Sequence, residues 1–369
     1  MSSSSLERRK NIDSTLLEIA KQFDISSSSY DRLKTAYLSV ASVLQQADSI
    51  KDSIIYPQGS INLGTEVKPV SDKYEYDIDL VFKVQNCNIS AYALKKAVGD
   101  QLKSSFRYKD KLDPEGRRCW TLQYDNFHMD ILPAKGYKNI DKIEITDKSD
   151  GSFKWIASNP TGYKKWFDSR MEKQLLVLDS AKETRPLPVY HTKTPLQRVV
   201  QLIKRHRDCY FQDKPENTRK YAPISILLTT IIAESYDNYQ DIYQTLVSAF
   251  TKLKQVLSLK PYQVINPINN EENFADKWNE NDQLAKVCCS WLRAAENDFL
   301  DLYSGENSLP YEKLKLMFGD SVVLSATEHK ASQLSPGSNR ITNCGLLSST
   351  QGLLIPKHTF YGDLPFAEK

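Results

Sequence analysis

The chain has 369 residues, with 49 Lys and Arg against 46 Asp and Glu, which gives a net charge of +3. This near-balance argues against a dedicated duplex-DNA binder, which has a clear excess of basic residues, but it still allows a local basic groove. Hydrophobic residues make up 40% and charged residues 26%. These are the proportions of an ordinary globular protein, long enough for one bilobal unit or two domains.

The apolar stretches and the cysteines exclude further classes of protein. The longest apolar run, Ile224–Ala233, has ten residues and is too short to cross a bilayer of ~30 Å. The start, MSSSSLERRK, lacks the apolar core of a secretion signal, so we expect a cytoplasmic protein with no membrane contact. The six cysteines form no C-x-x-C pair, and no histidine lies near Cys288–Cys289, which predicts reduced thiols and no zinc site.

The N-terminal half predicts one long helix and then a mixture of strands with a second helix. Residues 1–12 are Ser-rich and then basic, and we expect them to fray. Apolar residues at spacings of three and four predict a helix over 29–50, and a similar pattern predicts one over 90–105. Asp125-Asn126 is typical of a tight turn between two strands. The β-rich segments are TEVKPV (65–70), YEYDIDLVFKV (74–84) and RRCWTLQYDNFHMDILPA (117–134).

The second half is helical in pattern. Thr194 is a good N-cap and Pro195 suits the first position of a helix. From residue 333 the composition turns to Ser, Gly, Pro and Asn and the periodicity is lost, which predicts a mobile tail. Further helices are predicted over 222–236, 241–259 and 276–302. The expected organisation is an N-terminal segment (1–28), an α/β core with a long bracing helix (29–190), a helical lobe (191–332) and the tail (333–369).

Three carboxylates on two predicted strands indicate the chemistry. Asp77 and Asp79 are two residues apart, so a strand points both from one face while Ile78 and Leu80 face the other way. Asp130 lies in FHMDILP, where Met129 and Ile131 would face the core, so its carboxylate also points from the accessible face of a strand. If the two strands are neighbours, three like charges converge, which is unfavourable unless cations neutralise them. Such oxygen ligands suit Mg²⁺ or Mn²⁺, and two ions can hold the attacking and leaving oxygens of a phosphoryl displacement.

Gly59 and Ser60 precede the acidic strand, with seventeen residues from Ser60 to Asp77. A small turn of this kind can place N–H groups and a hydroxyl against a triphosphate, and the glycine allows a phosphate to approach closely. A lone D-x-D is most often a solvated strand face, and a lone Gly-Ser is a weaker signal still. The combination with a third strand-borne carboxylate is specific.

These segments resemble the catalytic core of the polymerase-β-like nucleotidyltransferases. Within that superfamily they resemble the bacterial cGAS/DncV-like nucleotidyltransferases (CD-NTases), which make cyclic oligonucleotide signals in anti-phage defence. The resemblance implies an α+β fold, with a mixed-sheet nucleotidyltransferase lobe, a helix near 29–48 that braces both lobes, and a helical C-terminal lobe. It covers about residues 30–300 and rests on QGSINLGTEVKPV, EYDIDLVF, FHMDILPA, SNPTGYKKWF, TPLQRVVQLIKRHRD, APISILLTTIIAESY and INPINNEENFADKW.

The resemblance also implies roles for matching positions. Asp77 and Asp79 would ligate two Mg²⁺ ions, with Mn²⁺ as an alternative. Asp130 would ligate the catalytic ion and help to deprotonate the attacking ribose hydroxyl. The residues implied for the donor nucleotide and its phosphates are Gln58, Gly59, Ser60, Lys204 and Ser225.

Several of these positions have competing interpretations. Lys204 lies on the polar stripe of its helix, which is also what a solvated helix face looks like, and Ser225 is also explained as a helix N-terminal hydroxyl. Arg205 and Arg207 are expected near the triphosphate. Ile226 stands where some relatives have a base-stacking tyrosine, so base stacking must come from elsewhere.

The implied activity is a Mg²⁺-dependent synthase that joins NTPs into a cyclic di- or trinucleotide second messenger for anti-phage (CBASS) signalling. ATP is the first expected substrate, with GTP or a pyrimidine NTP as alternatives, and no DNA activator is expected. The alternatives are a linear oligonucleotide or RNA-tailing nucleotidyltransferase, a nucleotidyltransferase toxin and a catalytically silent binding protein. Family tails are substrates of a ubiquitin-like ligation or ligands of a peptide-binding regulator, and this tail ends in FAEK rather than glycine.

Overall fold

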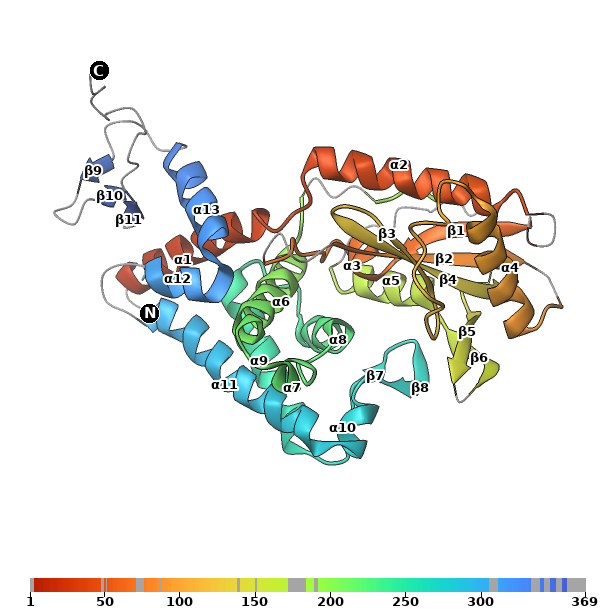
Figure 1. Cartoon of the computed structure of the whole chain (residues 1–369). Helices are drawn as coiled ribbons and strands as arrows, with labels where there is room; N and C mark the ends of the chain where they lie inside the picture. Colours follow the sequence, from red (N-terminus) through yellow and green to blue (C-terminus); the bar gives the residue numbers. More distant parts are fainter. Residues whose placement is uncertain are drawn as a thin grey trace, which may run out of the picture.

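Two lobes lie side by side in the chain, one built around a sheet and one built of helices (Figure 1). Within the described residues, we find no helix that is both long and apolar enough to cross a membrane. The computed structural model describes residues 3–47, 50, 52–70, 76–85, 88–137, 140–149, 151–171, 184–188, 192–304, 311–332, 339–341, 346–349 and 354–356.

A six-stranded mixed sheet forms the first lobe, as the predicted fold class requires. The strand order is β1-β2-β4-β5-β6, and β3 pairs with β4. Strands β2 and β4 are parallel, whereas the other pairs are antiparallel. The turn at Asp125-Asn126 joins β3 to β4, which confirms that prediction. The strands are β1 (Ser53–Gln58), β2 (Tyr76–Gln85), β3 (Trp120–Gln123), β4 (Phe127–Gly136), β5 (Ile143–Ser149) and β6 (Ser152–Ser158).

Helices α2 (Ser27–Leu44) and α4 (Ala91–Ser104) pack with one face of this sheet, and Ser26 and Ser90 cap their first turns. Both predicted helices are confirmed with shorter bounds. The buried hydrophobic residues of α2 belong to the core of the sheet lobe, whereas those of α1 (Ser3–Lys21) belong to the core of the helical lobe. The prediction that the helix near 29–48 braces both lobes is therefore wrong, since the chain passes between the lobes in the turn after α1.

The prediction that residues 1–12 fray is also wrong for residues 3–12, which are part of α1. Ile12, Leu16 and Ile19 lie on one face of this helix and are buried among the other helices. Fraying was expected because residues 1–10 are mostly Ser and charged residues. The apolar face of the helix begins only at Ile12. Two further helices, α3 (Gly59–Leu63) and α5 (Pro160–Ser169), follow β1 and β6 and contact each other.

The helical lobe begins with α6, where Thr194 forms a capping box with Gln197 and Pro195 is the first residue, as predicted. The helix predicted over 276–302 is interrupted at Asn281 and forms two helices. The other predicted helices are confirmed with shorter bounds. The elements are α6 (Pro195–Gln212), α7 (Glu216–Arg219), α8 (Ser225–Ser235), α9 (Ile242–Ser258), β7 (Ile265–Asn266), β8 (Asn269–Asn273), α10 (Asp276–Glu280), α11 (Asp282–Ser304), α12 (Tyr311–Phe318) and α13 (Asp320–Ser332).

Of the predicted tail, the structure describes three short strands that pair antiparallel, and the rest of 333–369, including the terminal FAEK, lies outside the described residues. The strands are β9 (Asn339–Ile341), β10 (Leu346–Ser349) and β11 (Leu354–Pro356). The described cysteines, which are Cys119, Cys209, Cys288 and Cys289, are free thiols as predicted. Cys87 and Cys344 lie outside the described residues.

Candidate active site

The three predicted carboxylates lie on adjacent parallel strands and on the same face of the sheet. Strands β2 and β4 pair so that Asp79 is the Cα partner of Asp130 and Asp77 is the partner of His128. The alternate residues of both strands face the hydrophobic core, because successive side chains of a strand point to opposite faces. The condition stated from the sequence, that the two strands be neighbours, is met.

The same register extends across four strands. Strand β1 places Gln58 beside Asp79, and β3 places Thr121 beside Asp130. One row across the sheet therefore contains an amide, two carboxylates and a hydroxyl, in the order Gln58, Asp79, Asp130, Thr121. Thr121 Oγ1 donates a hydrogen bond of 2.5 Å to Asp130 Oδ1. Sequence analysis missed Thr121, because its partner across the turn becomes clear only once the register is known.

The clustering of carboxylates has a clear electrostatic consequence at Asp79. Burial, and then the carboxylates of Asp77 and Asp130, raise the pKa of Asp79 to about 6. Both causes disfavour its charged form. Asp77 has a side chain that is 69% exposed, and its Oδ1 contacts Nε2 of His128. The negative charge of Asp79, which lies between Gln58 and Asp130 in the row, is therefore unfavourable in the absence of a cation.

Gly59 is required beside Asp79 by its backbone and by the space available. Its φ is +64°, in the left-handed region that favours glycine, and a Cβ at this position would lie 2.1 Å from Asp79 Oδ2. From the sequence, Gly59 was expected to allow a phosphate to approach the backbone closely. In the structure, the group that approaches it closely is the Asp79 carboxylate.

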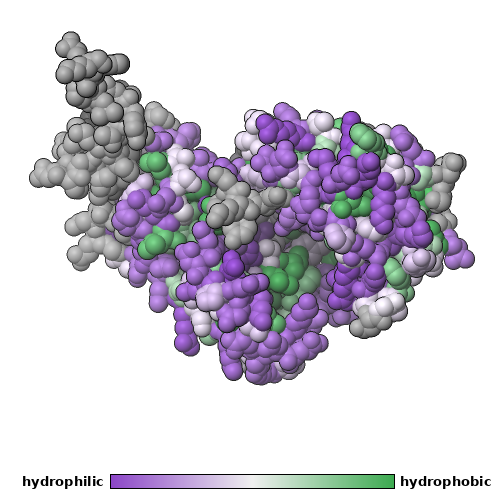
Figure 2. Space-filling view, viewed as in Figure 1, coloured by the Kyte–Doolittle hydropathy of each residue, from purple (hydrophilic) through white to green (hydrophobic). Residues whose placement is uncertain are grey.

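A cavity of about 530 Å³ lies between the lobes, bounded by α3 and β2 on one side and by α6 and α8 on the other. Its volume is in the usual range for a small-molecule site. Figure 2 shows the molecule hollowed between its two halves, with hydrophobic residues gathered beside the hollow. Gln58 and Asp130 flank Asp79 in the sheet and do not line the cavity. The predicted residues that line it are Gly59, Ser60, Asp77, Asp79, Lys204, Arg207 and Ser225.

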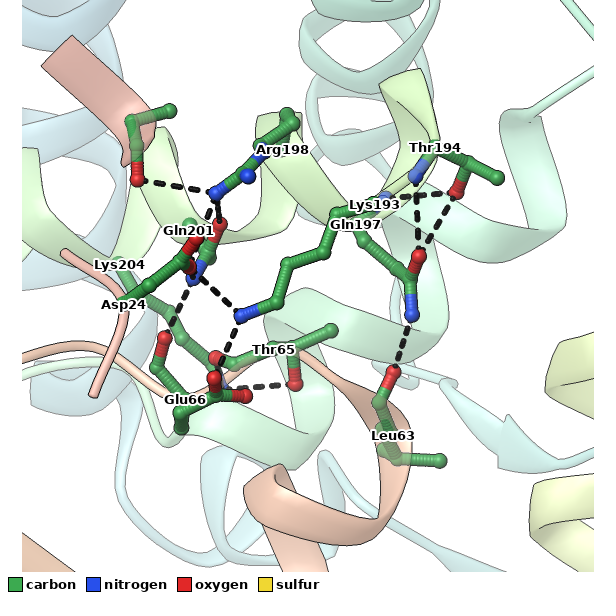
Figure 3. A network of polar contacts seen from close by, with 11 residues as sticks. Asp24, Leu63, Thr65, Glu66, Lys193, Thr194, Gln197, Arg198, Gln201 and Lys204 are labelled. Carbon is green, nitrogen blue, oxygen red and sulfur yellow. Dashed lines mark hydrogen bonds and ion pairs between the residues drawn. The ribbon is translucent and has the colours of Figure 1, made fainter. Parts of the chain in front are cut away.

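Lys204 extends from α6 into the contact between the lobes (Figure 3). It is 5% exposed, and its Nζ donates to the carbonyl oxygen of Thr65 at 3.1 Å and to Thr65 Oγ1 at 3.4 Å. Burial, and then the nearby charge of Arg207, lower the pKa of Lys204 to about 8. The competing interpretation of this stripe as a solvated helix face is wrong, because Gln197 and Gln201 are fully buried.

The polar stripe of α6 is buried because it holds the backbone of segment 63–68. Gln197 Nε2 donates to the carbonyl of Leu63 at 2.8 Å, and Gln201 Nε2 donates to that of Glu66 at 2.6 Å. Residues 65–70 were predicted as a strand and are not one. The carbonyl groups of Leu63 and Glu66 accept hydrogen bonds from side chains of α6 and are therefore not available to a neighbouring strand. This segment connects α3 to the helical lobe.

Arg205 belongs to the same contact. Its Nη1 donates to the carbonyl of Lys68 at 2.8 Å and its Nε to that of Phe318 at 2.8 Å. Arg205 does not line the cavity, so the prediction that it lies near the triphosphate site is wrong. A basic residue in a helix can satisfy backbone carbonyls as well as phosphates, and the sequence does not distinguish the two.

Buried charges reinforce this contact (Figure 3). Lys193 Nζ lies 2.7 Å from Asp24 Oδ1 and 2.5 Å from Glu66 Oε1. Arg198 Nη1 also donates to Asp24 Oδ1 at 2.9 Å, and these cations hold the pKa of Asp24 below its usual value despite its burial. Three segments far apart in sequence thus meet next to the cavity, which Glu66 also lines. The sequence contains no local signal for this network.

The helical lobe also supplies cations and apolar groups to the cavity. Arg207 Nη1 donates to Ser225 Oγ at 3.0 Å and to the carbonyl of Pro223 at 3.1 Å. Arg207 lines the cavity, as expected, and so does Arg219, which sequence analysis missed. Ile226 is part of the lining. The aromatic residues among the lining are Tyr76 and Phe211, which are candidates for the base stacking that Ile226 does not provide.

The carboxylate set fits divalent cations by its chemistry. Three neighbouring carboxylates, of which Asp77 and Asp79 have raised pKa values, form a set that a cation would neutralise. In the part of the chain that the structure describes, no three His, Cys, Asp or Glu side chains already converge as metal ligands. Asp77 turns toward His128, and Asp130 toward Thr121. Rotation of the Asp77 side chain away from His128 would bring its oxygens toward Asp79, while Asp130 has an oxygen, Oδ2, that is not bonded to Thr121.

Comparison with known proteins gives consistent matches. A family model described as the Second Messenger Oligonucleotide or Dinucleotide Synthetase domain matches residues 11–170. The chain is 31% identical over 380 residues to the c-di-GMP synthase of Roseivirga ehrenbergii, covering 96% of this chain and 98% of that protein. It is 23% identical over 348 residues to the cyclic dinucleotide synthase CdnG of Bradyrhizobium diazoefficiens, covering 85% and 81%.

Solved structures confirm the bilobal α+β fold. The B. diazoefficiens CD-NTase CdnG in complex with GTP aligns with a TM-score of 0.65 at 20% identity, covering 86% of this chain and 99% of that chain. Escherichia coli DncV in its 3′-deoxy GTP bound form aligns with a TM-score of 0.54 at 16% identity, covering 88% and 93%. The predicted lobes, a mixed sheet and a helical half, are therefore shared with both.

Proposed function

Since the chain belongs to the bacterial CD-NTase family and is a nucleotidyltransferase that synthesises a cyclic dinucleotide, we propose that it joins two GTP molecules into cyclic di-GMP. GTP replaces ATP, the substrate expected first, because the relative that is 31% identical is a c-di-GMP synthase. We also propose that the product acts as a second messenger in anti-phage (CBASS) signalling, as the family resemblance implies.

The observation that supports the proposed chemistry most strongly is the pairing of Asp79 with Asp130 on adjacent parallel strands, with Asp79 at the wall of the cavity. Asp77, Asp79 and Asp130 would hold two Mg²⁺ ions, with Mn²⁺ as the alternative, and the ions would neutralise charge that develops on the reacting phosphate. The cavity has both lobes in its lining, so a nucleotide bound there would contact both.

The residues of the chain have the following roles in the proposed reaction. The backbone at Gly59, the hydroxyl groups of Ser60 and Ser225 and the ammonium of Lys204 bind the donor triphosphate. Asp130 accepts the proton of a ribose hydroxyl of the acceptor GTP. The hydroxyl oxygen then forms a bond to the α-phosphorus of the donor, the bond to the pyrophosphate breaks, and pyrophosphate leaves. A second transfer in the opposite direction closes the ring.

Product analysis tests this proposal. The full-length protein is incubated with Mg²⁺ and with GTP, ATP or both, and the products are treated with phosphatase and weighed by mass spectrometry. A phosphatase-resistant product with the mass of cyclic di-GMP is expected from GTP alone. A product that loses terminal phosphates would instead support a linear oligonucleotide or RNA-tailing transferase, and label on a protein or tRNA would support a toxin.

Site variants connect the activity to the carboxylates. The double variant D77A/D79A is expected to release no pyrophosphate. Asp100→Ala, which removes an exposed carboxylate on α4 that pairs with Lys96 at the surface, is the control and is expected to match the wild type. Unchanged pyrophosphate release by the double variant would contradict the assignment.

A further inference from the structure

Thr121 occupies a fixed position beside Asp130. Strand β3 is held to β4 by its ladder, in which Thr121 is the Cα partner of Asp130. Its neighbours Trp120 and Leu122 are buried in the core of the sheet lobe, which leaves Thr121 on the carboxylate face. A β-branched side chain in a strand has few rotamers, so the hydroxyl has little freedom to leave Asp130.

The hydrogen bond from Thr121 Oγ1 to Asp130 Oδ1, at 2.5 Å, is short, as expected for a hydroxyl that donates to a carboxylate. Strands β2 and β3 pair with opposite edges of β4, so Asp79 and Thr121 flank Asp130 from opposite sides. Repulsion from the Asp79 carboxylate and attraction by the Thr121 hydroxyl therefore both turn Oδ1 of Asp130 away from Asp79 and toward Thr121. Oδ1 is occupied by Thr121, and the Cys119 thiol also donates to the Asp130 carboxylate, whose Oδ2 keeps an acceptor position for another partner.

We propose that Thr121 is a positioning residue for nucleotidyl transfer. Its hydroxyl fixes Oδ1 of Asp130 and so directs Oδ2 toward the cation and the ribose hydroxyl that Asp130 deprotonates. Thr121 touches neither nucleotide nor cation and acts through Asp130 alone. This inference rests on the proposed function, since it takes from it the role of Asp130.

The kinetic test compares Thr121→Val, which keeps the shape and removes the hydroxyl, with Thr121→Ser, which restores it. Thr121→Val is expected to lower kcat for cyclic di-GMP formation about 10-fold or more, the usual effect of removing a partner of a metal ligand. KM for GTP should change less than about twofold, since Thr121 makes no contact with the nucleotide in the proposal. Thr121→Ser should regain most of the lost rate.

A matched control exists on the same sheet. Thr146 is fully buried on β5, and its hydroxyl donates to the carbonyl of Arg118 at 3.4 Å. Thr146→Val makes the same chemical change away from the carboxylates and should leave kcat unchanged. If Thr121→Val does not fold, as judged by thermal unfolding, Thr121→Ala takes its place in both measurements.

A second readout does not depend on product formation. Binding of Mn²⁺ to the full-length protein without nucleotide is measured by electron paramagnetic resonance, and Thr121→Val should weaken it about 10-fold. If Thr121→Val keeps both wild-type kcat and wild-type Mn²⁺ affinity, or if Thr121→Ser is as impaired as Thr121→Val, the inference is overturned. If the wild type makes no cyclic product but Thr121→Val still weakens Mn²⁺ binding, Thr121 positions Asp130 for a cation and it is the proposed function that fails.

Discussion

The Asp79 carboxylate should cost the protein stability, so Asp79→Asn should remove activity and raise stability together. The pKa of Asp79 rises from 3.8 to about 6 because of its burial and the two carboxylates near it. A pKa raised by about 2 corresponds to about 3 kcal/mol at ~1.36 kcal/mol for each tenfold change in the equilibrium constant. An Asn side chain has nearly the same shape and no charge. The variant should therefore unfold at neutral pH with a free energy about 3 kcal/mol higher than the wild type, or about 5–10 °C higher in Tm.

The pH dependence distinguishes this cause from simple repacking. The native state binds the Asp79 proton more tightly than the unfolded chain, so the unfolding free energy of the wild type falls as pH rises from about 4 to about 6. The advantage of Asp79→Asn should be complete above about pH 6 and should vanish below about pH 4. Thermal unfolding from pH 3.5 to 8, without divalent cations, measures it. A variant that is no more stable than the wild type at pH 7.5 would refute the reasoning.

Asp147 provides a control of opposite sign. Its side chain is fully buried, yet hydrogen bonds from Arg117 and Arg118 hold its pKa down to about 2. The charge of Asp147 is therefore stabilising at neutral pH, and Asp147→Asn should lower Tm where Asp79→Asn raises it. Equal effects from both substitutions would show that loss of a carboxylate, and not its surroundings, determines the result.

Three further predictions concern the cavity and the contact between the lobes. KM for GTP should rise as pH increases past about 8, where Lys204 loses its proton, and Lys204→Arg should remove that rise up to pH 9.5 because arginine stays charged. Gly59→Ala should destabilise the protein by about 1–2 kcal/mol through its backbone alone and also lower kcat by displacing Asp79; normal kcat and Tm would contradict this. Lys193→Met leaves two carboxylates without their ammonium partner and should lower the unfolding free energy in urea by about 3–5 kcal/mol, whereas the exposed Lys96→Met should change it little.

The sequence predicted the parts of the site that depend on local pattern. Alternation in a strand placed Asp77 and Asp79 on one face, and the same rule placed Asp130 on the matching face of β4. Capping and periodicity located α6, because Thr194 and Pro195 mark its start. These predictions succeeded because each depends on the conformation of a few consecutive residues.

The rest depends on contacts between segments that are far apart in the sequence. The amphipathic pattern of α6 indicates which side of the helix is polar, but it does not indicate whether water or another backbone satisfies that side. Gln197 and Gln201 pair with carbonyls of segment 63–68, so a stripe that resembles a solvated face is buried. For the same reason Arg205 resembled a phosphate ligand and proved to hold Lys68 and Phe318. A polar pattern alone cannot identify its partner.

The distribution of charge over the two lobes explains why a nearly neutral protein suits a mononucleotide substrate. The sheet lobe presents carboxylates to the cavity, of which Asp77 and Asp79 line it. The helical lobe presents the cations Lys204, Arg207 and Arg219, together with the carboxylate of Asp208, which pairs with Arg207. A triphosphate with its cations has the complementary arrangement, since the phosphates face the cations and the metal ions face the carboxylates. Opposite charges that are segregated across one cavity sum to almost nothing over the chain, so a net charge of +3 is compatible with a strongly polarised site and gives no reason to expect a polymeric nucleic acid as ligand.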